Sequence, residues 1–297
     1  MHWSGVIPAL TTNLRPSGAI DHPAFARHCR RMIDHGCTGL ICAGSLGEAA
    51  TLSFDEKISL VRTAVRATRG RAPVALGIAA LRTAEGVALA RAAARAGAAG
   101  LMVLPPYVYS TDWREMKAHV AAILRATRLS GMLYNNPVAY RTDFLPDQIA
   151  ELAAEHPNLA AVKESSGDTR RIIALRAAVG SRLALLVGMD DAVVEGIRMG
   201  ATGWIAGLVN AFPAESVALF EAAARGNTAR ADTLYQWFLP LLRLDTVPKF
   251  VQLIKLVQAE TGTGSATVRP PRLELVGAER QAALAVLRTA LRTQPCW

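Results

Sequence analysis

Residues 74–104 read VALGIAALRTAEGVALARAAARAGAAGLMVL and contain one complete strand–helix–strand unit. The apolar run at 74–78 predicts a short strand, and the amphipathic run at 83–96 predicts a helix. Gly97 stands where a glycine commonly ends a helix, just before a second apolar run at 100–104. Short apolar strands that alternate with helices are typical of a parallel sheet covered on both faces.

The same alternation continues along most of the chain. Further strands are expected at 6–10, 40–43, 131–134, 160–163, 184–187 and 203–206. Further helices are expected at 23–35, 54–69, 113–127, 146–155, 169–179 and 191–199, the second of them opened by a capping box at Ser53. Eight strand–helix units in roughly 225 residues predict a (β/α)8 TIM barrel. A doubly wound sheet is the alternative, but PALTTNL at 8–14 is not the glycine-rich phosphate loop which that fold favours.

The pattern changes after Pro213. Helices without strands are expected at 215–224, 229–242, 247–261 and 278–293, with a Gly/Pro-containing loop at 262–272. The first of these helices completes the eighth unit of the barrel. We therefore predict a barrel over residues 1–225 and a C-terminal helical extension, residues 226–297, that packs on the barrel because no linker separates the two.

The composition excludes several classes of protein. Of the 297 residues, 51% are hydrophobic, which is too apolar for a disordered or fibrous chain. No run approaches the ~18 uncharged apolar residues of a membrane span, so no membrane partner is expected. The first residues, MHWSGVIPALTT, lack the pattern of a signal peptide, which makes a cytoplasmic protein the expectation.

Charge and cysteine usage exclude further classes. The formal net charge of +9 comes mostly from arginines scattered through helical stretches, whereas nucleic-acid binders gather basic residues with aromatic ones. No nucleic-acid partner is expected, although a mild attraction for anionic substrates is. The four cysteines show no CxxC spacing and the six histidines are isolated, so we expect neither a disulfide scaffold nor a metal site.

Lys163 is the strongest chemical signal. It closes an apolar run, so its amine is expected at the mouth of the barrel, where burial lowers the pKa of a lysine. A neutral amine can attack a ketone and form a Schiff base. Tyr134 ends the neighbouring strand and can transfer protons there. The structural alternatives are a lysine that snorkels to solvent or pairs with Glu164, and a tyrosine that only fills the core.

Three other strand ends carry polar groups. The GSLGE segment at 44–48 offers free backbone N–H groups for a substrate carboxylate, and the Ser45 hydroxyl can relay a proton to Tyr134. Tyr107 is a weaker candidate, because Tyr109 can take its place. Asp190-Asp191 either caps the next helix, which we favour, or binds a metal.

Together these motifs resemble the dihydrodipicolinate synthase/N-acetylneuraminate lyase family of class I aldolases. The resemblance runs from about residue 6 to residue 260 and rests on GSLGE, on YNNP at 134–137 and on KESSGD at 163–168. It implies that Lys163 is the Schiff-base lysine, Tyr134 the general acid/base and Ser45 the relay hydroxyl, with Tyr107 reaching a partner subunit's site in some members. It also implies a homo-oligomer, a dimer or tetramer, and an enzyme with no cofactor.

The substrate-binding residues expected on this basis are Ser45, Leu46, Asn136, Gly188 and Gly207. The chain departs from the synthases of the family, because Ser45-Leu46 stands where they carry two threonines. Arg141 is the only candidate for the arginine that follows their YN-x-P motif.

The combination of HWSGVIPA, GSLGE, YNNPVAYRTD and KESSGD looks most like the 1-pyrroline-4-hydroxy-2-carboxylate deaminases of hydroxyproline degradation. This resemblance implies a keto- or imino-acid lyase that forms 2,5-dioxopentanoate and ammonia. The alternatives are a 2-keto-3-deoxypentonate dehydratase, a pyruvate-dependent aldolase like dihydrodipicolinate synthase, and a non-catalytic keto-acid-binding regulator.

Overall fold

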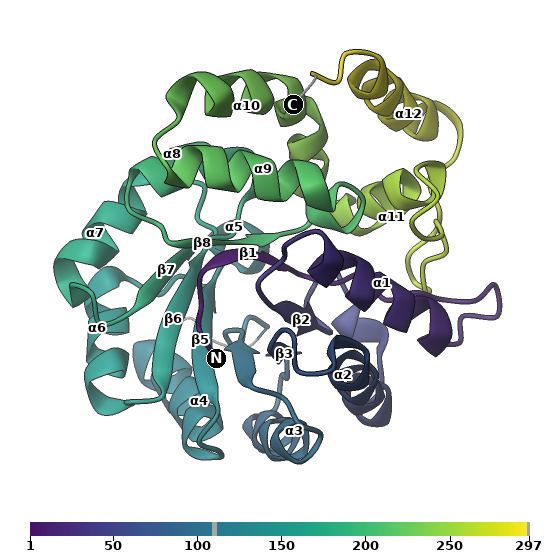
Figure 1. Ribbon diagram of the computed structural model, residues 1–297. Helices are drawn as coiled ribbons and strands as arrows, with labels where there is room; N and C mark the ends of the chain where they lie inside the picture. Colours follow the sequence, from purple (N-terminus) through teal and green to yellow (C-terminus); the bar gives the residue numbers. More distant parts are fainter. Residues whose placement is uncertain (109–111, 296–297) are drawn as a thin grey trace.

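Eight parallel strands form one sheet that closes on itself, and helices surround it (Figure 1). The computed structural model describes residues 1–108 and 112–295. Neighbouring strands follow the order β1-β8-β7-β6-β5-β4-β3-β2, and a bridge between Ala9 and Ile41 joins the first strand to the second. The Leu10 N–H donates to the Ile41 carbonyl across this junction at 2.9 Å. The predicted TIM barrel is confirmed.

The strands lie within one or two residues of their expected positions. Their bounds are β1 (Gly5–Pro8), β2 (Leu40–Cys42), β3 (Val74–Ile78), β4 (Gly100–Val103), β5 (Ser130–Asn135), β6 (Leu159–Glu164), β7 (Ala184–Val187) and β8 (Gly203–Ala206). Nearly every strand residue is buried, because side chains fill the barrel on one face and the helices cover the other.

The helices also follow the sequence pattern. Those of the barrel are α1 (His22–Asp34), α2 (Phe54–Thr68), α3 (Thr83–Arg95), α4 (Trp113–Arg125), α5 (Pro137–Tyr140), α6 (Pro146–Glu155), α7 (Arg170–Val179), α8 (Val193–Arg198) and α9 (Pro213–Ala224). Short 3-10 turns are η1 (Ala49–Thr51), η2 (Asp190–Ala192), η3 (Leu208–Asn210) and η4 (Arg243–Asp245). The capping box of α2 is confirmed, since the Ser53 hydroxyl accepts from the Glu56 N–H and the Glu56 carboxylate accepts from the Ser53 N–H.

The structure differs from the helix predictions at two places. The helix expected at 191–199 is divided into η2 and α8, and no side-chain cap bond is formed at the start of either. The short helix α5 was not expected, although Asn136 accepts from the Ala139 N–H at 2.9 Å and Pro137 follows it, a common start for a helix.

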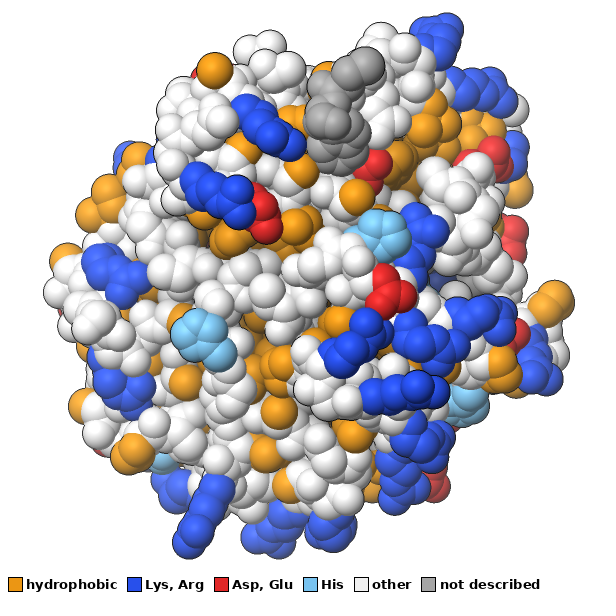
Figure 2. Space-filling model, viewed as in Figure 1, with side chains coloured by type: hydrophobic (Ala, Val, Ile, Leu, Met, Phe, Trp, Pro, Cys, Tyr) orange, Lys and Arg blue, Asp and Glu red, His pale blue; other side chains and the backbone are white. Residues whose placement is uncertain are grey.

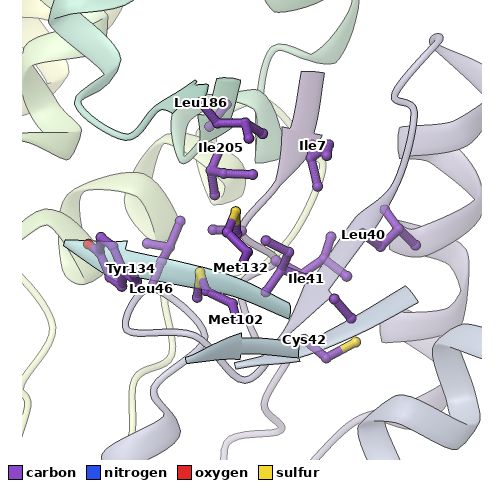
Figure 3. Packing of buried hydrophobic residues seen from close by; sticks show 14 of the residues in the cluster. Ile7, Leu40, Ile41, Cys42, Leu46, Met102, Met132, Tyr134, Leu186 and Ile205 are labelled. Carbon is purple, nitrogen blue, oxygen red and sulfur yellow. The ribbon is translucent and has the colours of Figure 1, made fainter. Parts of the chain in front are cut away.

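Large apolar side chains from several strands meet in the middle of the barrel. In Figure 3, Ile41, Met102, Met132 and Ile205 point toward one another, and each is at most 1% exposed. Tyr134 lies at the edge of this cluster, which places the end of β5 where the packed interior gives way to the mouth of the barrel. Cys29, Cys37 and Cys42 are buried and unpaired, and Cys296 lies outside the described residues.

The C-terminal helices continue outward from α9 along one side of the barrel (Figure 1). They are α10 (Thr228–Leu242), α11 (Phe250–Glu260) and α12 (Gly277–Arg292). Helix α10 packs on α9, and α12 packs on both α10 and α11, so the extension continues the outer helical layer. The division at residue 225 stays a prediction.

The surface is rich in basic side chains. Figure 2 shows them around much of the rim of one face and most densely over α1 and α2. Within residues 1–108 and 112–295, no helix combines the length and the apolarity that a membrane span requires.

Candidate active site

Lys163 stands near the carboxyl end of β6 and is only 6% exposed. Its Nζ lies 4.0 Å from the centre of the Tyr134 ring. Burial lowers the pKa of Lys163 to about 8, against the opposing attraction of Asp245 and Asp190. About one-tenth of the lysine is therefore a neutral nucleophile at pH 7, far more than for an ordinary lysine.

Glu164 does not neutralise this lysine. Its carboxylate accepts from the Ser166 N–H at 2.6 Å and from Asn135 Nδ2 at 3.1 Å instead. The alternative of a Lys163–Glu164 pair is thus wrong, and the amine is left free for chemistry.

Gly188, at the end of β7, leaves the space that the Lys163 side chain occupies. A Cβ atom at this position would lie 2.6 Å from Lys163 Cε and 1.9 Å from Ser165 Oγ. Glycine is required here because any side chain would collide with the stem of the lysine.

Tyr134 is the direct strand partner of Lys163 in the register of β5 and β6. Its hydroxyl accepts a hydrogen bond from Asn136 Nδ2 at 2.9 Å, so Asn136 positions the tyrosine. Burial raises the pKa of Tyr134 to about 12, which keeps the phenol protonated and able to donate.

Tyr140, at the end of α5, is a site residue that the sequence did not reveal. Its ring lies 4.7 Å from the ring of Tyr107 and meets the ring of Tyr134 edge-on at 5.8 Å. The Ser45 hydroxyl forms a hydrogen bond with the Tyr140 hydroxyl. The direct Ser45–Tyr134 contact suggested by the sequence is therefore not found, because Tyr140 occupies that side of the serine. The alternative to Tyr107, Tyr109, lies outside the described residues.

The loop after β2 holds two unused backbone donors. The N–H groups of Ser45 and Leu46 donate to no acceptor among the described residues, and both residues line the cavity described below. The turn depends on Glu48, which adopts a left-handed φ of 61°. This loop can hold a substrate carboxylate through its two N–H groups.

Asp190 has a different role from the one expected. Its buried carboxylate accepts from Trp204 Nε1 at 2.9 Å, from the Gly207 N–H at 3.1 Å and from the Leu208 N–H at 2.7 Å. The predicted helix cap is wrong because these donors from β8 and the turn after it satisfy the carboxylate. Among the described residues, no three His, Cys, Asp or Glu side chains are grouped as a metal site would require.

The candidate site residues face one cavity of about 490 Å³ at the carboxyl ends of the strands, the functional end of such barrels. Its lining includes every site residue expected from the sequence: Lys163, Tyr134, Ser45, Tyr107, Leu46, Asn136, Gly188 and Gly207. The C-terminal region adds Asp245, Phe250 and Arg272, which the sequence pattern did not reveal. Arg141 is exposed and does not line the cavity.

Comparison with known proteins identifies the family. The model of the dihydrodipicolinate synthetase family matches residues 2–290. The chain belongs to this family. The 4-hydroxy-tetrahydrodipicolinate synthase of Rhizobium meliloti is 32% identical over 98% of both chains, and that of Xanthomonas axonopodis pv. citri is 39% identical over 76% of this chain and 74% of its own.

Solved structures of the dihydrodipicolinate synthetase family share the fold. The chloride-inhibited dihydrodipicolinate synthase of Acinetobacter baumannii, complexed with pyruvate, has a TM-score of 0.93 and is 27% identical over 97% of this chain and 99% of its own. Members of the family are class I aldolase-type enzymes that use a lysine Schiff base, so the prediction of an enzyme is confirmed.

Proposed function

We propose that this enzyme forms a Schiff base between Lys163 and a small 2-keto or 2-imino acid, and that its substrate is 1-pyrroline-4-hydroxy-2-carboxylate. The products are 2,5-dioxopentanoate and ammonia. The buried amine with its lowered pKa supports the role of Lys163, and the adjacent phenol supports that of Tyr134. Substrate carboxylate would bind the N–H groups of Ser45 and Leu46.

The observation that carries the choice of substrate is that, among the described residues, the cavity wall holds both free backbone donors and an acidic side chain without a hydrogen-bond donor. The loop after β2 offers the backbone donors of Ser45 and Leu46, and the C-terminal region adds the acidic side chain of Asp245 beside Gly207. Leu46 adds an apolar side chain, and Arg141 lies outside. A pocket of this kind suits a monocarboxylate that also carries a hydrogen-bond donor, such as a protonated nitrogen or a hydroxyl.

The reaction follows from this arrangement. Lys163 adds to C2 of the cyclic imine, and cleavage of the bond between C2 and the ring nitrogen leaves a linear iminium. The iminium acidifies the C3 proton. The hydroxyl relay of Tyr134, Ser45 and Tyr140 accepts this proton while it passes one to the C4 hydroxyl, which departs as water. Loss of a C5 proton and return of a proton to C3 give an enamine at C5. This enamine tautomerises and hydrolyses to the aldehyde and ammonia, and hydrolysis at C2 frees Lys163.

Two further reactions use the same lysine. A 2-keto-3-deoxypentonate dehydratase would carry out the same elimination without a ring. Dihydrodipicolinate synthase activity is favoured by the names of the curated relatives and by Arg272, a cation on the cavity wall that can meet a second carboxylate. By family resemblance we expect a homo-oligomer, a dimer or tetramer.

The test is to incubate the purified enzyme with 1-pyrroline-4-hydroxy-2-carboxylate and to measure ammonia and 2,5-dioxopentanoate together. Equal amounts of both support the deaminase. Lys163→Ala should abolish turnover, whereas Lys249→Ala, at an exposed lysine, should not change it. Parallel assays use 2-keto-3-deoxypentonate, and pyruvate with aspartate semialdehyde. If the pyrroline releases no ammonia and one of these two parallel assays shows turnover, the activity measured in that assay replaces the proposed function.

A further inference from the structure

Asp245 reaches the active-site cavity from outside the barrel. It lies in η4, after α10, and its carboxylate rests against Gly207 at the end of β8. A Cβ atom at Gly207 would lie 2.1 Å from Asp245 Oδ1 and 2.4 Å from Oδ2. The barrel therefore admits this carboxylate only because position 207 has no side chain.

The Asp245 carboxylate has no partner among the described residues. It accepts no hydrogen bond there, and its Oδ1 is closed to solvent although the residue as a whole is partly exposed. Asp190 beside it, in contrast, is satisfied by Trp204, Gly207 and Leu208. A buried oxygen without a donor destabilises the fold, and a ligand that brings a donor removes that cost.

Asp245 also acts on the reactive lysine. Both residues line the same cavity, and Asp245 is the main carboxylate that opposes the fall in the pKa of Lys163. Burial and the neighbouring Asp190 raise the pKa of Asp245 well above its usual range, against the attraction of Lys163. A raised pKa makes the carboxylate of Asp245 a better proton acceptor than an ordinary aspartate, as a proton carrier requires.

We propose that Asp245 binds the nitrogen of the substrate and carries a proton from Lys163 to that nitrogen when the ring opens. This inference rests on the proposed function for the identity of the substrate. It assigns two groups on the cavity wall to separate tasks: Ser45, Tyr134 and Tyr140 serve the carbon atoms, and Asp245 serves the nitrogen.

The step balances without any added reactant. The neutral Lys163 amine adds to C2 of the protonated ring imine, which forms the new C–N bond and leaves a positive charge on Nζ. Asp245 takes a proton from Nζ and gives it to the ring nitrogen. The lone pair of Nζ then forms the C2=Nζ iminium, while the electrons of the broken C2–N bond remain on the departing nitrogen, now an amine. Asp245 ends in its starting state.

The experiment isolates ring opening with 1-pyrroline-2-carboxylate, which lacks the C4 hydroxyl and so cannot undergo elimination. Reduction with cyanoborohydride traps the opened Schiff base on Lys163. Mass spectrometry then measures this reduced adduct, which carries the free amine released when the ring opens. Pyruvate serves as the nitrogen-free comparison. Asp245→Asn should lower the trapping rate with the pyrroline about 100-fold, within the range for loss of one acid–base group. It should not lower trapping with pyruvate, because loss of the Asp245 charge makes the Lys163 amine neutral more readily.

Asp232→Asn is the matched control, because Asp232 is an exposed carboxylate on α10 that pairs with Arg198 outside the cavity. It should change neither trapping rate. Normal trapping of pyruvate shows that the Asp245 variant is folded. Equal loss with both ligands, or no loss with either, overturns the role of Asp245.

The two proposals fail separately. If the wild-type enzyme releases no ammonia from 1-pyrroline-4-hydroxy-2-carboxylate, the proposed function is wrong, while the ratio of pyrroline to pyruvate trapping still tests Asp245. If ammonia is released at the same rate by the wild type and by Asp245→Asn, the proposed function holds and the role of Asp245 does not.

Discussion

The Lys163 amine combines burial with the absence of any carboxylate in direct contact. Among the described residues, Lys255 and Glu48 form a fully buried ion pair, and Lys163 forms none. Its position over the Tyr134 ring offers a favourable but weaker interaction for the charged form than an ion pair would. Burial therefore dominates, and the neutral amine is accessible.

A pH dependence follows from the pKa of Lys163. Because the folded-state pKa is lowered to about 8, the amine is protonated and unreactive below that pH and neutral above it. The rate of Schiff-base formation with pyruvate should rise from pH 6 through pH 8 and then level off. Rapid-quench trapping at a series of pH values measures this profile. A rate that continues to rise beyond pH 10 would indicate an ordinary lysine and contradict the prediction.

Tyr140 links Ser45 to the two other tyrosines of the cavity. Tyr140→Phe keeps the ring packing but removes the hydroxyl that meets Ser45. Turnover should fall about 100-fold because one member of the proton-transfer group is lost, while the Schiff base with pyruvate should still form. Steady-state kinetics and trapping on the same preparation give both quantities.

Tyr235→Phe is the control for Tyr140. The Tyr235 hydroxyl donates to Glu195 at 2.8 Å, away from the cavity lining, so turnover should be unchanged. A normal turnover of Tyr140→Phe would remove Tyr140 from the mechanism.

At the scale of the elements, the register of β5 and β6 brings Tyr134 and Lys163 together. The pairing shifts between Gly131, opposite Leu159, and Met132, opposite Ala161, so Ala160 is the extra residue of a bulge. Without this bulge Tyr134 would pair with Val162, and Lys163 would be displaced by one residue. The bulge thus aligns two catalytic candidates that regular pairing would misalign.

The Lys163 side chain at the end of β6 also requires the glycine that follows β7. Gly188→Ala should abolish Schiff-base formation, because the new Cβ would overlap the Lys163 stem and Ser165 Oγ. Trapping with pyruvate measures the loss, and circular dichroism establishes that the barrel is retained. In the double variant Gly188→Ala/Ser165→Ala the contact with Ser165 is removed but that with Lys163 remains. Full recovery in the double variant would show that the lysine is not the residue displaced.

For the molecule as a whole, the C-terminal region holds the active-site loops in place. Lys255 on α11 donates to Glu48 at 2.5 Å and to the Thr267 carbonyl at 2.6 Å. The Arg269 N–H donates to the same glutamate at 2.9 Å, and its guanidinium contacts both oxygens of Glu56 at the start of α2. The loop at 262–272 therefore joins the GSLGE loop to α11, and through Arg272 it also reaches the cavity.

Lys255→Met tests this connection. The substitution leaves Glu48 charged and buried without its cation, which should lower the free energy of unfolding by about 3–5 kcal/mol. Urea denaturation followed by fluorescence measures the change. The double variant Lys255→Met/Glu48→Gln should recover part of it, because the unpaired charge is then absent.

Lys249→Met provides the comparison, because Lys249 pairs with Glu279 on the surface, where both side chains are about half exposed. That change should cost at most about 1 kcal/mol. Similar losses for Lys249→Met and Lys255→Met would show that the buried pair has no special part in stability.

The sequence by itself determined the barrel and the two central residues of the site. Apolar periodicity and glycine stops are local signals, so the strands and most helices could be placed from them. Lys163 and Tyr134 could be paired in advance because successive strands of such a barrel are neighbours, and the ends of those strands form its mouth.

Only the tertiary structure decided the other walls of the cavity. Asp245 meets Gly207, Tyr140 meets Ser45, and Lys255 meets Glu48 across long stretches of chain. No periodic pattern encodes such contacts, because they depend on how the outer helices pack against the barrel. The same reason explains why Asp190 was expected to cap a helix, since its donors on Trp204, Gly207 and Leu208 reach it only when β8 lies beside β7.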